Sequence, residues 1–172
     1  MITYISQPLS RNQLRSYARQ IRKFLGIEDD LYFPVMEVLE ILPEIFPKLT
    51  WEVVSDDELP YHIHAETDII THHIRIKESV YDGACNGKGR DRMTIVHEIA
   101  HYFILCVSGI RLQRNFSPNK VVTYCDPEWQ AKCLAGELMI PAYLVKDLNV
   151  FEVEEKCGVS FEAACYQLRR IS

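Results

Sequence analysis

The sequence predicts an α+β domain in which a small, mostly antiparallel sheet packs against several helices. Helical patterns occupy the N-terminal part of the chain and its tail, three short extended segments lie between them, and one apolar helix carries two histidines and a glutamate. A chain of 172 residues is long enough for one domain with a sizeable core. We therefore expect a single domain made of N-terminal helices (1–48), a central core (49–146) and a C-terminal helix pair (147–172).

The first helix is predicted to begin after Ser10, its N-cap, and to end near Phe24, where Gly26 follows as a stop. Its apolar stripe consists of Leu14, Ala18, Ile21 and Leu25. Its basic residues fall at helical spacing and are predicted to form a solvated face: Arg11, Arg15, Arg19, Arg22 and Lys23.

A second helix is expected from about Pro34 to Leu42, ending against Pro43. Extended segments with turn-prone connections follow it and predict the strands of the sheet: Thr50–Val54, Tyr61–Ala65 and His73–Lys77.

A glycine-containing loop, CNGKGRD at 85–91, is expected to lead into the apolar helix, with Asp91 as its cap. Its glycines lack the spacing of a phosphate-binding loop. Residues 107–124 have no strong periodicity and predict a connection.

Asp126 and Pro127 then mark a helix start, with the cap followed by proline at the first helical position. That helix is expected to reach about Met139 before Pro141. The tail predicts two short helices, separated by Gly158 and capped by Ser160.

The composition is that of an ordinary soluble globular protein, with 48% hydrophobic and 25% charged residues. The net charge is −5 and no basic cluster interrupts the chain, so binding to nucleic acid is not expected. The six cysteines form no CxxC pair and are expected to be reduced, as small apolar residues of a cytoplasmic protein. Neither a secretory signal nor a membrane span is expected.

The apolar helix, TIVHEIAHYFIL at 94–105, places His97 and His101 four residues apart on one face, with Glu98 beside them. Burying such groups without partners costs roughly 2 to 7 kcal/mol each, which a marginally stable domain cannot tolerate three times over. Two histidines at this spacing can direct ring nitrogens at one cation, and the pattern is typical of a zinc site in a metalloprotease. Glu98 would then be the general base that takes a proton from water.

A third protein ligand is needed, and Glu128 is the first candidate. On its predicted helix it shares a face with Ala131, Ala135 and Leu138, whose small or apolar side chains allow close packing against another helix. Glu137 falls about 180° away, on the face expected to be wet. Helix polarity alone also favours a glutamate in a first turn, so Glu137 and Asp126 stay open as alternatives.

The segment GRDRMTIVHEIAHYF, followed after a short connection by ExxAxxxAxxLxxP, resembles the ImmA/IrrE family of zinc metallopeptidases. The resemblance extends upstream to HIRIKESVYDGACNG and covers roughly residues 60–145. It implies a zincin-like fold with a central HExxH helix, one Zn²⁺ held by His97, His101 and Glu128, and Glu98 as the catalytic glutamate. Three positions depart from the family's pattern: Leu134 replaces a common Phe, LMIP replaces LLMP, and Cys106 stands where many members carry a histidine.

Other side chains are candidates for stabilising the oxyanion, and the sequence does not choose among them: His62, His64, His72, His73, Tyr102 and Tyr124. The segment His73–Lys77 is expected to be an edge strand that holds an extended peptide by backbone pairing.

These features predict a zinc metalloendopeptidase that performs limited proteolysis of a protein inside a bacterial cell. The resemblance implies that the substrate is a DNA-binding, helix-turn-helix repressor, often encoded in a mobile element or phage. The rival from another class is a metal-stabilised binding or sensor module that does not hydrolyse its partner. Direct DNA regulation through the tail is a third reading, but Arg169 and Arg170 lie too late in their helix for base contacts. The choice between zinc and manganese and the oligomeric state stay open.

Overall fold

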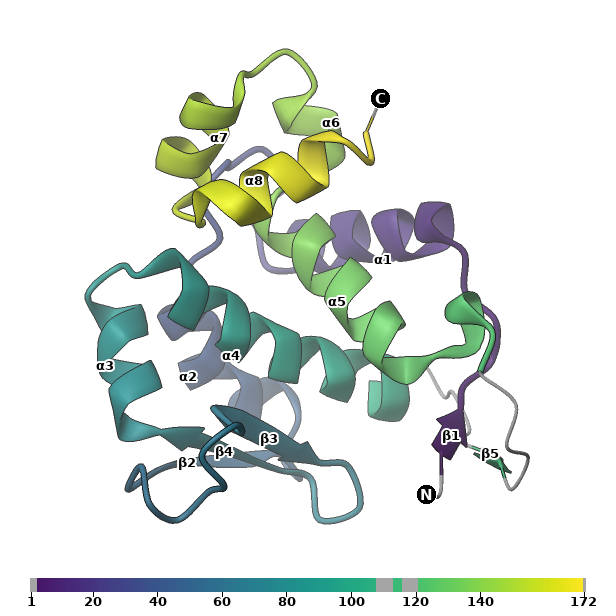
Figure 1. Ribbon diagram of the computed structural model, residues 1–172, viewed down its shortest axis with the longest axis vertical. Helices are drawn as coiled ribbons and strands as arrows, with labels where there is room; N and C mark the ends of the chain where they lie inside the picture. The colour runs from purple at the N-terminus through teal and green to yellow at the C-terminus, as the bar shows by residue number, and fades with distance from the viewer. Residues whose placement is uncertain (1–2, 108–112, 116–120, 172) are drawn as a thin grey trace.

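The computed structural model describes residues 3–107, 113–115 and 121–171 of the chain. It is an α+β fold with eight α-helices, a three-stranded mixed sheet and a two-stranded ribbon among these residues (Figure 1). The elements in chain order are β1 (Thr3–Ile5), α1 (Arg11–Phe24), α2 (Val35–Ile45), β2 (Thr50–Val54), β3 (Ala65–Asp68), β4 (His73–Lys77), α3 (Glu78–Cys85), α4 (Gly89–Tyr102), a π-helical turn (Phe103–Val107), β5 (Gln113–Asn115), a 3₁₀ turn (Thr123–Cys125), α5 (Pro127–Met139), α6 (Ala142–Val145), α7 (Val150–Cys157) and α8 (Phe161–Leu168).

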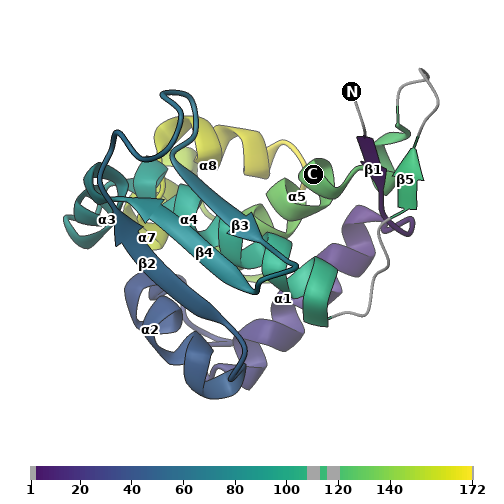
Figure 2. The same ribbon diagram turned by 90° about the horizontal axis from the view of Figure 1, so that it is seen from below.

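Helix α4 lies at the centre of the fold, between the sheet and α5 (Figures 1 and 2). It packs on β3 and on α2 and α3 at one side and on α5 at the other. Helix α5 is itself covered by α1 on its far side, and α8 contacts its C-terminal half. Two of the side chains that fill this core are Ile95 and Ile99 of α4, both fully buried. The element that carries the two histidines therefore lies between the sheet and a second helical layer.

The three-stranded sheet is mixed rather than mostly antiparallel, so that prediction was wrong. The strand order is β2-β4-β3, with β2 parallel to β4 and β3 antiparallel to it. Strand β4, the second strand of the β3–β4 hairpin, pairs with β2. That strand carries Ile74 and Ile76, both fully buried, and the central place suits the strand with the most apolar inner face.

The expected strand at residues 61–65 was also misplaced, because β3 begins only at Ala65. Pro60 starts a turn in which its carbonyl accepts a hydrogen bond from the Ile63 amide. Tyr61 is 97% exposed, so the apolar alternation that mimicked a strand lies in a solvated loop. Ala65–Asp68 is therefore one of the two edge strands of the sheet, and β2 is the other.

Helix α1 has the predicted boundaries. The Ser10 hydroxyl accepts a hydrogen bond from the Gln13 amide and the Gln13 side chain returns one to Ser10, a capping box. The prediction that all its basic residues form a solvated face was wrong for Arg22, which is fully buried. Its guanidinium donates to the carbonyls of Leu138 and Asp30, and these bonds replace the water that burial removes. Arg22 thus joins α1 to the end of α5.

Several helices differ from the sequence predictions. Helix α2 runs past Pro43 to Ile45, since a proline near the C-terminus removes only one hydrogen bond of the last turns. Helix α3, at Glu78–Cys85, was not predicted. Helix α4 starts at Gly89 with Lys88 as its cap residue, so Asp91 lies in the first turn instead of capping it.

The two tail helices are as predicted, with Gly158 in the left-handed conformation at φ 62° and the Ser160 hydroxyl accepting from the Ala163 amide. Arg92 of α4 holds this turn in place. It is 1% exposed and donates to the carbonyls of Cys157 and Gly158 on the tail and of Phe33 before α2. The tail is thereby fixed to the N-terminal half of α4.

Among the described cysteines, Cys133 and Cys157 are buried as apolar residues, whereas Cys85 is exposed, and none forms a disulfide. The side chain of Cys106 and most of the connection at 108–120 lie outside the described residues. In the part of the chain that the structure describes, no helix is both long and apolar enough to cross a membrane.

Candidate metal centre

Two histidines on consecutive turns of α4 face the same side of the helix. The Nε2 atoms of His97 and His101 are 3.1 Å apart, and the ring centroids are 4.6 Å apart. Four residues of an α-helix make slightly more than one turn, so the spacing alone places both rings on one face. The histidines are therefore presented as a pair toward α5.

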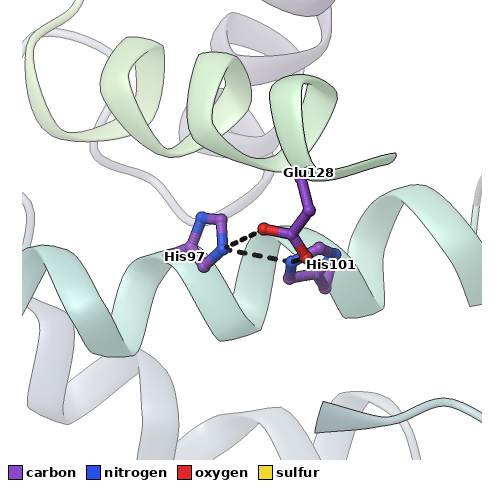
Figure 3. Close-up of side chains that lie close together, drawn as sticks. All are labelled: His97, His101 and Glu128. Atoms are coloured by element: carbon purple, nitrogen blue, oxygen red, sulfur yellow. Dashed lines mark hydrogen bonds and ion pairs between the residues drawn. The ribbon is translucent and has the colours of Figure 1, made fainter. Parts of the chain in front are cut away.

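The third member of the group comes from the first turn of α5. The Glu128 carboxylate lies 3.3 Å from His97 Nε2 through Oε2 and 3.1 Å from His101 Nε2 through Oε1 (Figure 3). Asp126 begins this helix by accepting a hydrogen bond from the Glu128 amide, which fixes where the glutamate leaves the helix. Asp126 is thus the cap residue, and Glu128 is the residue that reaches the histidines.

Glu137, the alternative ligand, faces the opposite way, but not toward water as predicted. It is 1% exposed and accepts two hydrogen bonds from Arg15 of α1, each 3.1 Å long. The periodicity correctly separated the two glutamates by about half a turn. It missed that α5 is buried on both faces, because α1 covers the side that was expected to be solvated.

The three side chains can hold a metal ion. Their ligand atoms all lie within 4.8 Å of one another. The two histidine side chains are 20% and 12% exposed, whereas the Glu128 side chain is 61% exposed, so the group opens to solvent on the glutamate side. Hydrogen bonds from His101 and His97 hold the pKa of the Glu128 carboxyl well below its usual range. A cation at this point would meet an ionised carboxylate and two imidazole nitrogens.

Glu98 follows His97 on α4, and its side chain reaches toward the sheet, where it contacts Thr67 of β3. It is 8% exposed, and the hydroxyl of Thr67 on β3 lies 2.8 Å from its Oε2 atom and 3.1 Å from its backbone carbonyl oxygen. Burial raises the pKa of the Glu98 carboxyl to about 7, although the Thr67 hydrogen bond and nearby His97 lower it in part. A carboxylate with a pKa near neutrality is suited to taking and returning a proton.

The sequence did not predict the contact between Thr67 and Glu98. Thr67 lies on the edge strand β3, and its hydroxyl joins that strand to α4 beside the metal-ligand candidates. Because the contact depends on how the sheet packs against the helix, no spacing or composition near Thr67 indicates it.

The other side chains, which were predicted as candidates for stabilising the oxyanion, lie in different parts of the structure. His62 and His64 precede β3 in a loop rather than sharing a strand face. His72 Nδ1 lies 3.2 Å from the hydroxyl of Tyr102, which is buried at the far end of α4. Tyr124 is half-exposed just before α5, and its carbonyl accepts from Gln130. None of these contacts selects a residue that would stabilise an oxyanion.

The predicted peptide-binding edge was placed on the wrong strand. β4, at His73–Lys77, is paired on both sides and offers no free edge. The edge nearest α4 belongs to β3, whose Thr67 lies against Glu98. The reason is the hairpin order: β4 docks against β2 and leaves β3 outside.

The comparison with known proteins finds similarity in structure but little similarity in sequence. A transcriptional regulator from Mycobacterium tuberculosis superimposes with a TM-score of 0.61 at 15% sequence identity, over 91% of this chain and 48% of that one. The chain thus spans about half the length of that solved structure, and at this identity the likeness concerns the fold alone. A scan against protein-family models and a search of curated protein sequences gave no match.

Proposed function

We propose that the protein is a zinc-dependent metallopeptidase of the gluzincin type, related to the ImmA/IrrE family, that cleaves an intracellular protein at a limited number of sites. One observation carries the proposal: His97 and His101 of α4 and Glu128 of α5 converge on one point, and Glu98 lies next to them with a pKa of about 7. A small sheet that packs against the helix carrying HExxH also supports the proposal.

The donor set fits Zn²⁺ with three protein ligands. Catalytic zinc sites of this type use two histidines and one carboxylate and keep a further position open. With bonds of about 2.0 to 2.2 Å, the ligand atoms of a tetrahedral site are separated by roughly 3.3 Å. The Nε2 atoms of His97 and His101 are 3.1 Å apart, and each lies 3.3 or 3.1 Å from a different oxygen of the Glu128 carboxylate. The exposed side of Glu128 leaves room for water and substrate.

Bound zinc would act as a Lewis acid toward the scissile carbonyl and lower the pKa of a nearby water. Glu98 would take the proton of that water as it attacks, and would give a proton to the departing amine nitrogen. Burial raises the pKa of Glu98 in the metal-free protein, and a carboxyl with a raised pKa is suited to taking and returning a proton. Thr67 would hold the Glu98 carboxylate in place through its 2.8 Å hydrogen bond.

The free edge of β3 would bind the substrate. An extended peptide that pairs with this edge lies over α4, because Thr67 of the same strand is in contact with Glu98. Backbone pairing accepts many sequences, so it suits a substrate that is a protein segment rather than a small molecule. The family resemblance implies that this protein segment belongs to a helix-turn-helix repressor, and we include that substrate in the proposal.

The rival function is a metal-stabilised binding or sensor module that regulates a partner without hydrolysis. Glu98 argues against it, because a purely structural zinc site needs no base and burying this carboxylate is unfavourable enough to raise its pKa. Its position one residue after His97 and in contact with Thr67 of β3 supports a role in hydrolysis.

The test combines metal analysis with a cleavage assay on three forms of the full chain. The purified protein should hold about one zinc per chain, Glu128→Ala should lose it, and Glu98→Gln should keep it. With a helix-turn-helix repressor from the same genome as substrate, the wild type should cleave and Glu98→Gln should not. Zinc retained by Glu128→Ala would refute the ligand set. Unchanged biological activity of Glu98→Gln would favour the binding module.

A further inference from the structure

Two phenylalanines lie side by side on the outer surface of the tail. Phe151 of α7 is 68% exposed and Phe161 of α8 is 40% exposed, and their ring centroids are 5.6 Å apart. The two helices form one end of the molecule, away from the sheet (Figure 1). Large aromatic side chains are mostly buried in folded proteins, so a pair of them in contact with each other and with water indicates a surface that binds something.

The core of the tail does not include this pair. The side chains that the tail buries are each at most 5% exposed: Val153, Cys157, Val159 and Ala164. Neither phenylalanine belongs to the hydrophobic core. The starts of both helices are capped by polar side chains, and the turn between them is held by Arg92. Formation of the tail therefore does not account for the two exposed rings.

Carboxylates lie beside the two rings. Glu154 and Glu155 come three and four residues after Phe151, so they lie next to it on the surface of α7. Glu162 follows Phe161 at the start of α8, and both Glu155 and Glu162 are exposed. We call these five residues the tail surface: Phe151, Phe161, Glu154, Glu155 and Glu162.

The three glutamates of the tail surface have no ion-pair partner in the part of the chain that the structure describes. The lysine of α7, Lys156, lies 3.4 Å from Glu152 and pairs with that residue instead. The net charge of −5 adds to the negative potential around the molecule. The tail surface thus combines apolar area with negative charge that no ion pair compensates.

This combination determines the charge of a partner. Glutamates repel the phosphates of nucleic acids and of anionic membranes. A second copy of the chain that docked through the same surface would bring the glutamates of both copies together, which is unfavourable. A positively charged protein segment suits both parts of the surface. Its lysines or arginines can pair with the glutamates or lie over the rings, and an apolar side chain can cover the phenylalanines.

We propose that the tail surface is a docking site for a basic amphipathic helix of a partner protein. Such a helix, laid against α7 and α8, places a large apolar side chain such as leucine against the two phenylalanines and its basic side chains against the three glutamates. The proposal goes beyond the peptidase function, because binding at this surface requires neither a metal ion nor Glu98. It gives the tail a role that the candidate metal centre does not explain.

Binding of designed peptides to the full chain tests the proposal. The probe is a labelled helical peptide with leucines on one face and lysines on the other, and its Kd is measured by fluorescence anisotropy. Two matched peptides change one feature each: glutamates replace the lysines, or alanines replace the leucines. The leucine–lysine peptide should bind at least about fivefold more tightly than either matched peptide. Its Kd should rise severalfold from about 50 mM to about 300 mM NaCl, because salt screens the glutamates.

Substitutions of phenylalanine separate this site from general attraction to an acidic protein. Phe151→Ala should weaken binding of the leucine–lysine peptide by about 5- to 30-fold, the loss expected for an aromatic anchor. Phe24→Ala removes an exposed phenylalanine from α1 and should change the Kd by less than about twofold. Melting temperatures verify that the variants fold. If Phe151→Ala does not fold, Phe161→Ala removes the other ring and should weaken binding in the same way.

Substitutions of glutamate test the charge of the surface with an equal change elsewhere as control. The double variant Glu154→Gln, Glu155→Gln should weaken binding about 3- to 10-fold at low salt and reduce the effect of salt. The double variant Glu37→Gln, Glu40→Gln removes the same charge from exposed positions of α2 and should change the Kd by less than about twofold.

The outcomes either support the tail surface or overturn it. Equal losses for Phe151→Ala and Phe24→Ala, or for the two glutamine pairs, would show adsorption to an acidic protein and refute the site. Tighter binding of duplex DNA or of anionic vesicles, lost in Phe151→Ala, would refute the assigned charge of the partner. Self-association lost in the same variant would make the occupant a second copy instead. Zinc-loaded and metal-free protein should bind the peptide equally, so failure of the proposed metal centre would leave this result unchanged.

Discussion

Replacing Glu137 by alanine should destabilise the protein by about 2 to 3 kcal/mol. The side chain is 1% exposed and accepts a pair of 3.1 Å hydrogen bonds from Arg15, with Arg11 at 3.9 Å. Removing one partner of a fully buried ion pair costs roughly 3 to 5 kcal/mol. Here the Arg15 side chain is 28% exposed and can turn toward water, so the expected cost lies at or below the lower end of that range.

Urea unfolding of the metal-free protein measures this effect. With a slope of roughly 2 kcal/mol per molar urea, the midpoint of Glu137→Ala should fall by about 1 to 1.5 M. The matched control is Glu128→Ala on the same helix. Its carboxylate is 61% exposed, so its loss should change the unfolding free energy by less than about 1 kcal/mol while it abolishes zinc binding.

A double-mutant cycle with Arg15→Ala isolates the pair. The double variant should be more stable than the sum of the single changes predicts, by about 1 to 3 kcal/mol, because each single change already removes the interaction. If the Glu137→Ala midpoint moved by less than roughly 0.3 M, or if the two changes were additive, then the ion pair would not hold α1 to α5 and the account of the two faces of α5 would be wrong.

Three further predictions concern Glu98 and the start of α4. Because burial raises the pKa of Glu98 from 4.5 to about 7, the folded metal-free protein binds more protons than the unfolded chain between these values, so stability should fall as pH rises through them. The loss should be on the order of 3 kcal/mol in urea titrations, and Glu98→Gln, which cannot ionise, should remove it. Thr67→Val should lower the cleavage rate roughly tenfold at unchanged zinc content, whereas Thr67→Ser, which keeps the hydroxyl, should retain most of the rate. Gly89→Ala should lower the melting temperature strongly, because its Cβ would overlap the backbone of the α7–α8 turn. Gly87→Ala, with φ 78° and open space around it, should cost only about 1 to 2 kcal/mol, and equal losses for the two glycine variants would contradict this packing.

Local signals predicted the helices well and the sheet poorly. Ser10, Asp126 and Ser160 each cap a helix where the sequence indicated, because a cap depends on residues two or three positions apart. The order of the strands depends instead on which strand docks against a partner far away in the chain. The buried face of β4 decides that order, and neither its antiparallel hairpin with β3 nor its parallel pairing with β2 has a local signature.

The part of the candidate site that depends on helical geometry was predictable from the sequence. His97 and His101 share a face by spacing alone, and the periodicity of α5 distinguished Glu128 from Glu137. The contact of Thr67 with Glu98 was not predictable, because it joins a strand to a helix through tertiary packing. Arg22 was missed for the same reason: its burial depends on the carbonyls that end α5 and follow α1.

The placement of α5 between two helices makes the N-terminal segment part of the histidine–glutamate geometry. Residues 11–24 contribute no candidate metal ligand. They nevertheless pack against the side of α5 that faces away from the histidines, where Arg15 forms an ion pair with Glu137. A shortened chain that starts after Phe24 would therefore keep the HExxH motif. In that chain α5 would be free to rotate about its own axis. A shortened chain that is meant to keep the histidine–glutamate group together should therefore retain α1.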